Sequence, residues 1–263
     1  MKKISARLFT SVLLIITVAV AGTPLAGHAA SEVAARDWNL SGLTNVPSGL
    51  SNVVAVAAGG FHSLALTTEG RVVAWGDNGP GQTTVPSGLS NVVAIAAGYR
   101  HSLALTAEGR VVGWGENYSG QMTVPSGLSN VVAIAAQYEQ SLALTAEGRV
   151  VGWGIYRYVM YNETAPVTVP SGLSNVVAIA AGSNRSLALT AEGRVVAWGY
   201  NGLIGGTYVL SGLSNVVAIA AGGYHSLTLS GLPPSVAAPA WVGPQFLMAV
   251  VDRVADLGEQ LHP

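Results

Sequence analysis

The feature that most constrains the fold of this chain is a sequence repeat. The string Gly-Leu-Ser-Asn-Val-Val occurs five times, at offsets of 39, 39, 45 and 40 residues. The copies begin at Gly49, Gly88, Gly127, Gly172 and Gly212. Self-similarity at such a period is typical of arrays in which each copy is one supersecondary unit that buries its apolar face against its neighbours. The fold is therefore expected to be a series of similar units.

Each unit is predicted to contain four short strands, which we call A to D. In the second unit strand A spans 91–97, an apolar run typical of a strand buried on both faces. Strands B and C span 102–106 and 110–114, and Gly109 between them suits a tight hairpin. Strand D spans 121–125 and ends in a proline, which favours a sheet edge. The fold class is therefore predicted to be all-β.

The two ends of the repeat region are complementary half-units. Residues 31–48 resemble the second half of a unit, and the copy that begins at Gly212 stops after its first half. Four-stranded sheets in tandem can close radially into a β-propeller. We expect five blades, one of them a composite that joins the N- and C-terminal half-repeats.

The segments outside the repeats have a different character. Residues 1–29 combine a basic start (Lys2, Lys3, Arg7), an apolar run and small residues before the expected cut, as in a secretory signal peptide. The run is short for a membrane anchor, which is the alternative. The propeller is expected over 30–231, and 232–263 is expected to be a partly helical tail. The predicted location is therefore secreted or cell envelope, with no membrane attachment after cleavage.

Composition and charge exclude several classes of function. The chain has no cysteine, so disulfides and cysteine-based metal sites are impossible. After cleavage near Ala29 it carries 9 Lys and Arg against 13 Asp and Glu, a formal net charge of −4. Nucleic-acid binding needs a basic face, so it is not expected.

The histidines that precede strand B are expected to make structural hydrogen bonds between blades. His62, His101 and His225 hold this place, but Gln140 and Arg185 hold it in the other units. A metal site would not accept arginine as a ligand. We predict no metal, no cofactor and no catalytic residues.

The repeat resembles the RCC1 (regulator of chromosome condensation) family. The resemblance rests on Ala-Ala-Gly-x-x-His-Ser-Leu-Ala-Leu-Thr followed by Glu-Gly-Arg-Val-Val-x-Trp-Gly-x-Asn, and it covers roughly residues 33–230. The string Gly-Gln-Thr-Thr-Val-Pro at 81–86 is similar to secreted bacterial β-lactamase-inhibitor propellers. The resemblance implies a β-propeller with binding loops on one face. Members of both groups have seven blades, whereas this chain has units for five.

Comparison of the copies with one another indicates where binding could occur. The B–C turns and D–A loops hardly change between units, whereas the A–B tips and the C–D loops differ in every unit. Both variable loops emerge on one face, and aromatic and arginine side chains there are typical anchors of protein interfaces. Neutral drift of loops is the alternative. The candidate partner-binding residues are Phe61, Tyr99, Arg100, Tyr118, Tyr138, Glu139, Tyr156, Tyr158, Tyr161, Asn184, Tyr200 and Tyr224.

The sequence thus predicts a secreted module that binds another protein and is not an enzyme. The partner's identity and the oligomeric state remain open. One alternative is a structural repeat module, or a fragment of a larger cell-surface protein. A β-lactamase-inhibitor-like role and an enzyme with a central pocket are remoter alternatives, and strand A offers only Val, Ala, Ile and Gly for such a pocket.

Overall fold

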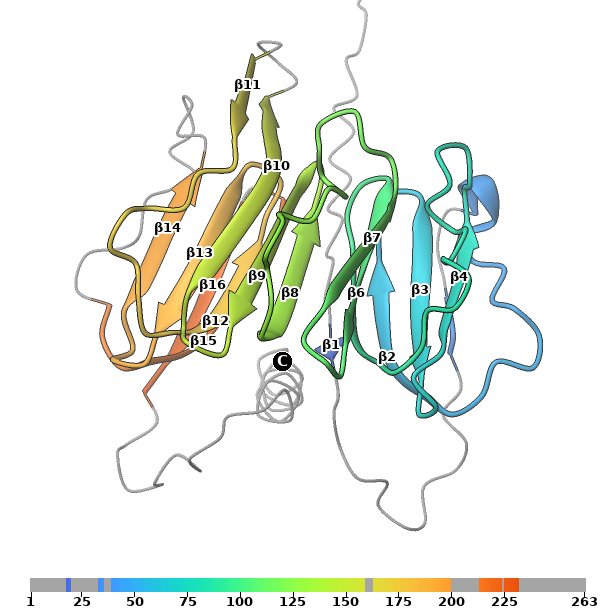
Figure 1. The fold of residues 1–263 in the computed structure, drawn as a ribbon, viewed down its shortest axis with the longest axis horizontal. Coiled ribbons are helices and arrows are strands. Elements are labelled where there is room, and N and C mark those ends of the chain that lie inside the picture. Colours follow the sequence, from blue (N-terminus) through green and yellow to red (C-terminus); the bar gives the residue numbers. More distant parts are fainter. Residues whose placement is uncertain are drawn as a thin grey trace, which may run out of the picture.

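The computed structural model describes residues 18–19, 33–35, 39–158, 163–199, 213–223 and 225–231. Trp38, Tyr161, Tyr200, Tyr224 and the predicted tail at 232–263 lie outside these residues. Within them the protein is built of five antiparallel sheets, which lie side by side (Figure 1). No helix in the described part is long and apolar enough to cross a membrane.

Strands A, B and C form as predicted, within one or two residues, except that strand C of the third unit is longer than predicted. Strand A is β2 (Val53–Ala58), β5 (Val92–Ala97), β8 (Val131–Gln137), β12 (Val176–Ala181) and β15 (Val216–Ala221). Strand B is β3 (His62–Thr67), β6 (His101–Thr106), β9 (Gln140–Thr145), β13 (Arg185–Thr190) and β16 (Ser226–Ser230). Strand C is β4 (Val72–Gly76), β7 (Val111–Gly115), β10 (Val150–Tyr158) and β14 (Val195–Gly199). The hydrogen-bonded order is A-B-C in each complete unit.

Among the described residues strand D forms only in the third unit, as β11 (Glu163–Pro166) paired with the extended end of β10. The strand predicted at 121–125 is absent, because its backbone makes local turn bonds such as Thr123 N–H to Gly120 O (3.0 Å). The segment still lies against strand C, since a Cβ on Gly113 would be 2.6 Å from the Met122 carbonyl oxygen. The candidate residues Tyr156 and Tyr158, which were expected in the C–D loop of this unit, belong instead to β10.

Two further elements lie near the N-terminus. The short strand β1 (Val18–Ala19) pairs antiparallel with β2, opposite Val56 and Ala55. It lies within the predicted signal peptide at 1–29, so cleavage near Ala29 would remove it. A single 3-10 turn, η1 (Leu40–Gly42), precedes the first complete unit.

The A strands form the inner side of the array, because the A strands of successive units lie next to one another. They are not buried throughout, contrary to the prediction. Each A strand has a register shift after its first residue, as at Val92/Ala94. The bulged residue turns outward, so Val93, Val132 and Val177 are 41–52% exposed.

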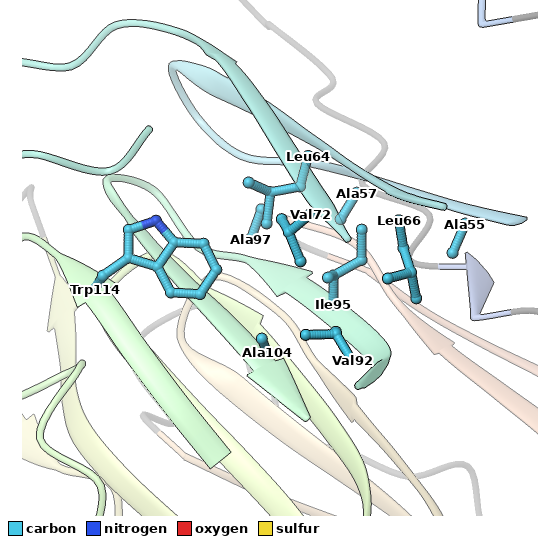
Figure 2. Packing of buried hydrophobic residues seen from close by; sticks show 10 residues of the cluster. All are labelled: Ala55, Ala57, Leu64, Leu66, Val72, Val92, Ile95, Ala97, Ala104 and Trp114. Carbon is cyan, nitrogen blue, oxygen red and sulfur yellow. The ribbon is translucent and has the colours of Figure 1, made fainter. Parts of the chain in front are cut away.

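Each apolar core lies between two successive units. Leu64 and Leu66 of the first unit pack against Ile95 and Ala104 of the second, with Trp114 at the outer end (Figure 2). The same positions form the cores between the later units. A unit therefore has no core of its own, and burial of its apolar side chains depends on its neighbours.

The composite blade is not formed by the described residues. Strands β15 and β16 make a two-stranded sheet, and β16 bonds only to β15. Four of the five β16 residues are exposed, whereas β6, β9 and β13 are buried throughout. In the N-terminal half-repeat at 31–48, strand C is expected at Trp38, and residues 36–38 lie outside the described residues. Among the described residues β16 therefore has no covering strand.

The invariant Glu-Gly-Arg turns link each unit to the next. The amide N–H of Val131 donates to the carbonyl of Gly109 (3.1 Å), and Asn130 Nδ2 donates to Glu147 Oε1 (3.1 Å) within its own unit. Equivalent bonds recur in the other complete units, in which the loop asparagine has a φ of 53° to 55°. The near-identity of these loops thus has a structural cause.

Replacing Gly109 by alanine is expected to destabilise the protein more than the same change at Gly120. Both have similar positive φ (74° and 72°), which costs an L-residue about 1–2 kcal/mol. Only at Gly109 would the new Cβ crowd the next unit, 3.1 Å from the Val131 nitrogen, whereas nothing lies within 4 Å of Gly120. Urea unfolding of both variants measures the difference, and equal losses would contradict this packing role.

Candidate protein-binding surface

In each of the first three units a backbone hydrogen bond joins the A–B tip to the start of the C–D loop. Asp77 N–H donates to Phe61 O (2.8 Å), Glu116 N–H to Arg100 O (2.9 Å) and Ile155 N–H to Glu139 O (3.0 Å). This bond places the two variable loops side by side at one edge of the sheets. The predicted convergence of the variable loops on one face therefore has a repeated structural basis.

Neighbouring units are also linked along this face. Gly60 N–H donates to Gly98 O (3.1 Å), and Tyr99 N–H donates to Tyr138 O (2.9 Å). Ser119 Oγ in the C–D loop of the second unit donates to Glu139 Oε2 in the third (2.7 Å). The first three units thus present their loops in a fixed relation.

Three aromatic rings from the A–B tips form a continuous row. The rings of Phe61 and Tyr99 meet edge to face with centroids 4.9 Å apart, and those of Tyr99 and Tyr138 stack at 5.1 Å. The guanidinium of Arg100 lies 4.8 Å from the centre of the Phe61 ring, in cation–π contact. All four side chains are partly exposed. We call this group the aromatic row.

Backbone and ring contacts both hold the aromatic row in place. Tyr138 has a φ of 49°, a conformation that is uncommon outside glycine, and its carbonyl accepts the Tyr99 N–H. Aromatic contacts of this kind hold the rings in place before any ligand arrives. Large, preorganised aromatic surface next to a guanidinium is the composition typical of interface hot spots.

The remaining candidate residues lie in different environments. Tyr118 is 92% exposed in its C–D loop, and Asn184 is half-buried in the A–B tip of the fourth unit. Tyr156 is buried, and its hydroxyl lies 3.0 Å from Ser186 Oγ, so it belongs to the core between units and not to the surface. Burial also raises the pKa of Tyr156 to about 12. The side chain of Tyr158 and all of Tyr161, Tyr200 and Tyr224 lie outside the described part.

The polar residues that recur from unit to unit form a separate, buried layer between neighbouring units, which we call the seam. His62 Nε2 lies 2.8 Å from Ser102 Oγ of the next unit, and Ser102 Oγ donates to the Gln82 carbonyl (2.9 Å). The Trp114 indole N–H donates to the same carbonyl (2.9 Å). The next seam repeats the pattern, as His101 Nε2 lies 2.9 Å from Ser141 Oγ and Gln121 O accepts from Ser141 and Trp153. The predicted structural hydrogen bonding between units is therefore confirmed for His62 and His101, whereas His225 is exposed.

This His–Ser pair is not arranged for nucleophilic catalysis. The single hydroxyl proton of Ser102 is given to the Gln82 carbonyl, so His62 Nε2–H must donate to Ser102. A general base would have to accept that proton instead. Desolvation lowers the pKa of His62 to about 4, against a smaller opposing effect of Asp77. Desolvation, with His62 nearby, lowers the pKa of His101 to about 3.

The seam adapts where the histidine is replaced. In the third unit the Gln140 amide donates to Arg185 O (2.9 Å) and to the Gly182 carbonyl, and its Oε1 accepts from Ser186 Oγ (2.7 Å). In the fourth unit Arg185 Nη2 donates to Gly222 O (3.3 Å). Sequence reasoning missed Gln82 and Gln121, which are fully buried, although both recur seven residues after a Trp-Gly tryptophan. Among the described residues no group of His, Asp and Glu could hold a metal ion.

Comparison with known proteins identifies the repeat. The family model of the regulator of chromosome condensation (RCC1) repeat matches residues 53–82, 92–121 and 176–203. The protein pim1 of Schizosaccharomyces pombe is 51% identical over 39 residues, which are 15% of this chain and 7% of pim1.

Solved structures show the same fold. Yeast RCC1 (Prp20), in its complex with Kap60, is 29% identical with a TM-score of 0.52, over 68% of this chain and 54% of that chain. Human WBSCR16 is 25% identical with a TM-score of 0.54, over 68% of this chain and 58% of that chain. Prp20p from Saccharomyces cerevisiae, studied for its binding to Gsp1p and histones, is 22% identical with a TM-score of 0.55, over 79% of this chain and 61% of that chain. The chain thus spans somewhat more than half of the propellers that it matches.

Proposed function

Three stretches of the chain are RCC1 repeats, and its sheets have the fold of RCC1 β-propellers. From this premise we propose that the protein binds another protein through the aromatic row. The observation that carries the proposal is the unbroken contact of Phe61, Tyr99 and Tyr138 across three successive units, with Arg100 on its end. Strand and turn positions are nearly identical in these units, so the row arises from the few positions that differ.

The chemistry of the row favours a protein ligand. Aromatic rings and a guanidinium supply apolar area together with hydrogen-bond donors, the combination that is enriched in protein interfaces. The relatives named above support such a role for the fold, since structures of Prp20 concern its binding of Kap60, Gsp1p and histones. Those partners belong to Prp20, and the loops of this chain set its own specificity.

We also propose that the protein is exported. Lys2, Lys3 and Arg7 precede an apolar run and the small residues Gly27 and Ala29. The binding partner would then be met outside the cytoplasm, and N-terminal sequencing of the exported protein tests the cut near Ala29. An intact N-terminus would contradict export by cleavage.

The substitution Tyr99→Ala is expected to weaken partner binding strongly, because Tyr99 contacts both other rings of the row. Truncation of a central hot-spot residue weakens binding by about 30-fold or more. The wild-type protein and the variant are used side by side as affinity baits, and proteins captured by wild type alone are purified. Their Kd values for both baits are then measured by calorimetry.

Two matched variants make the result specific. Tyr99→Phe keeps the ring and should retain binding within a few-fold. Glu147→Gln changes an exposed residue in a B–C turn, at the opposite end of the strands, and should leave the Kd unchanged. Equal binding by wild type and Tyr99→Ala, with both variants folded by circular dichroism, would refute the aromatic row as the site.

A further inference from the structure

We infer that copies of this chain associate head to tail through the two end faces of the row of sheets. This inference is independent of the aromatic row. Each complete unit has an outgoing face, which packs on the following unit, and an incoming face, which packs on the preceding one. Among the described residues no complete unit precedes the first unit or follows the fifth, so one face of each kind is left uncovered there.

The outgoing end face is apolar and open. Leu227 of β16 is 58% exposed, whereas Leu64, Leu103 and Leu142 at the same repeat position are 0% exposed. Ala220 and His225 on this face are also exposed. The residues equivalent to Leu227 and His225 are buried between all earlier units. The outgoing end face therefore has the composition of a protein core but is exposed to solvent.

The incoming end face is open in the corresponding place. Val56 of β2 is 40% exposed, and its counterpart Ile95 is 1% exposed. Ala58 is exposed, and its counterpart Ala97 is fully buried. The pairing of β1 with β2 leaves Val56 accessible.

The two end faces lack complementary parts of one blade. The outer part of the incoming face is covered, because the Trp75 indole donates to Leu43 O (2.9 Å) as Trp114 does to Gln82 O. Residues around Leu43 thus take the place of the outer segment that a preceding unit would supply. The incoming end face still lacks the A and B strands of such a unit. Strands β15 and β16 are an A–B pair that has no outer strand among the described residues.

The polar groups of the seam are complementary as well. His225 occupies the position of His62, and Ser63 occupies the position of Ser102. In the interior seam these two positions are joined at 2.8 Å and fully buried. At the ends His225 is exposed and Ser63 is half-buried, so docking would restore the hydrogen bond together with the apolar contact.

A second copy is the occupant that these observations favour. Both halves of the seam are present on one chain, yet both stay exposed in the described structure. The chain spans 54–61% of the propellers that it matches. The contact is heterologous, since the outgoing face of one copy meets the incoming face of another.

Analytical ultracentrifugation over a wide concentration range tests this. The wild-type protein is expected to associate, and Leu227→Asp and Val56→Asp each to weaken association on the order of 100-fold, because each places an unpaired carboxylate in the seam. Val177→Asp is the matched control, since Val177 is 52% exposed but lies on an inner strand of the fourth unit. It should associate like the wild type.

Mixing the two end variants gives the sharpest readout. Leu227→Asp retains an intact incoming face and Val56→Asp an intact outgoing face, so an equimolar mixture is expected to form a dimer that grows no further. A wild-type chain that stays monomeric at the highest concentration, as when its two ends close on each other, overturns the inference. So does a mixture that stays monomeric while both variants keep the wild-type circular dichroism spectrum.

Discussion

Lowering the pH from 7.5 to 4.5 is expected to reduce the free energy of unfolding by roughly 5 kcal/mol, about half of it from each of two buried histidines. The imidazoles of His62 and His101 are fully buried at the seams between units, and burial lowers their pKa values to about 4 and about 3. Urea unfolding at a series of pH values measures the effect.

The sign follows from which state binds the proton. In the unfolded chain a histidine takes up a proton near pH 6.5, whereas in the folded protein His62 and His101 do so only near pH 4 and pH 3. Between these values the unfolded state binds more protons, so stability is present above pH 6.5 and is lost as the pH falls. The hairpin carboxylates add little in this range, since the pKa of Glu69 lies below 4.5, chiefly through a hydrogen bond from Thr67.

The third unit suggests the variant that removes this dependence. Gln140 occupies the histidine position there and satisfies its seam without a titrating group. The double variant His62→Gln and His101→Gln should therefore lose most of the slope between pH 6.5 and 4.5. His225→Gln, at an exposed position, should keep the wild-type profile. A slope retained in the double variant would show that other groups cause it.

Leu103→Ala is expected to destabilise the protein by about 3 kcal/mol, and Leu227→Ala by less than 1 kcal/mol. The two leucines hold the same place in strand B, but Leu103 is 0% exposed between units and Leu227 is 58% exposed at the end of the row. The first truncation leaves a cavity against Val131, Ile134 and Trp153, which cannot collapse easily within the packed seam. The second removes a side chain that water already contacts.

The comparison is made by urea unfolding at a concentration below self-association. Because both substitutions are the same chemical change in the same repeat position, the difference reports only the presence of a following unit. Equal losses would mean that the end face of the fifth unit is covered, and would contradict both the packing described here and the open end face.

The sequence by itself determined the unit of this fold. Apart from the extended end of β10, the period placed strands A, B and C to within one or two residues, because apolar runs between glycine-rich turns have few alternatives. It also identified the loops that vary, since five copies of one unit can be compared directly. The structural role of His62 and His101 could be predicted because Gln140 and Arg185 hold the same position in other units.

Only the tertiary structure showed the features that depend on contacts between units. Strand D was predicted wrongly at 121–125, because local turn bonds and Pro125 leave no ladder there. Tyr156 was predicted at the surface, but it lies on the extended end of β10 and is buried between two units. The residues next to it in the sequence do not indicate this burial. The aromatic row joins residues 38 or 39 positions apart, and the exposure of Val56 and Leu227 depends on which units are present. Neighbouring units create these features, because in a repeat protein every buried surface lies between copies.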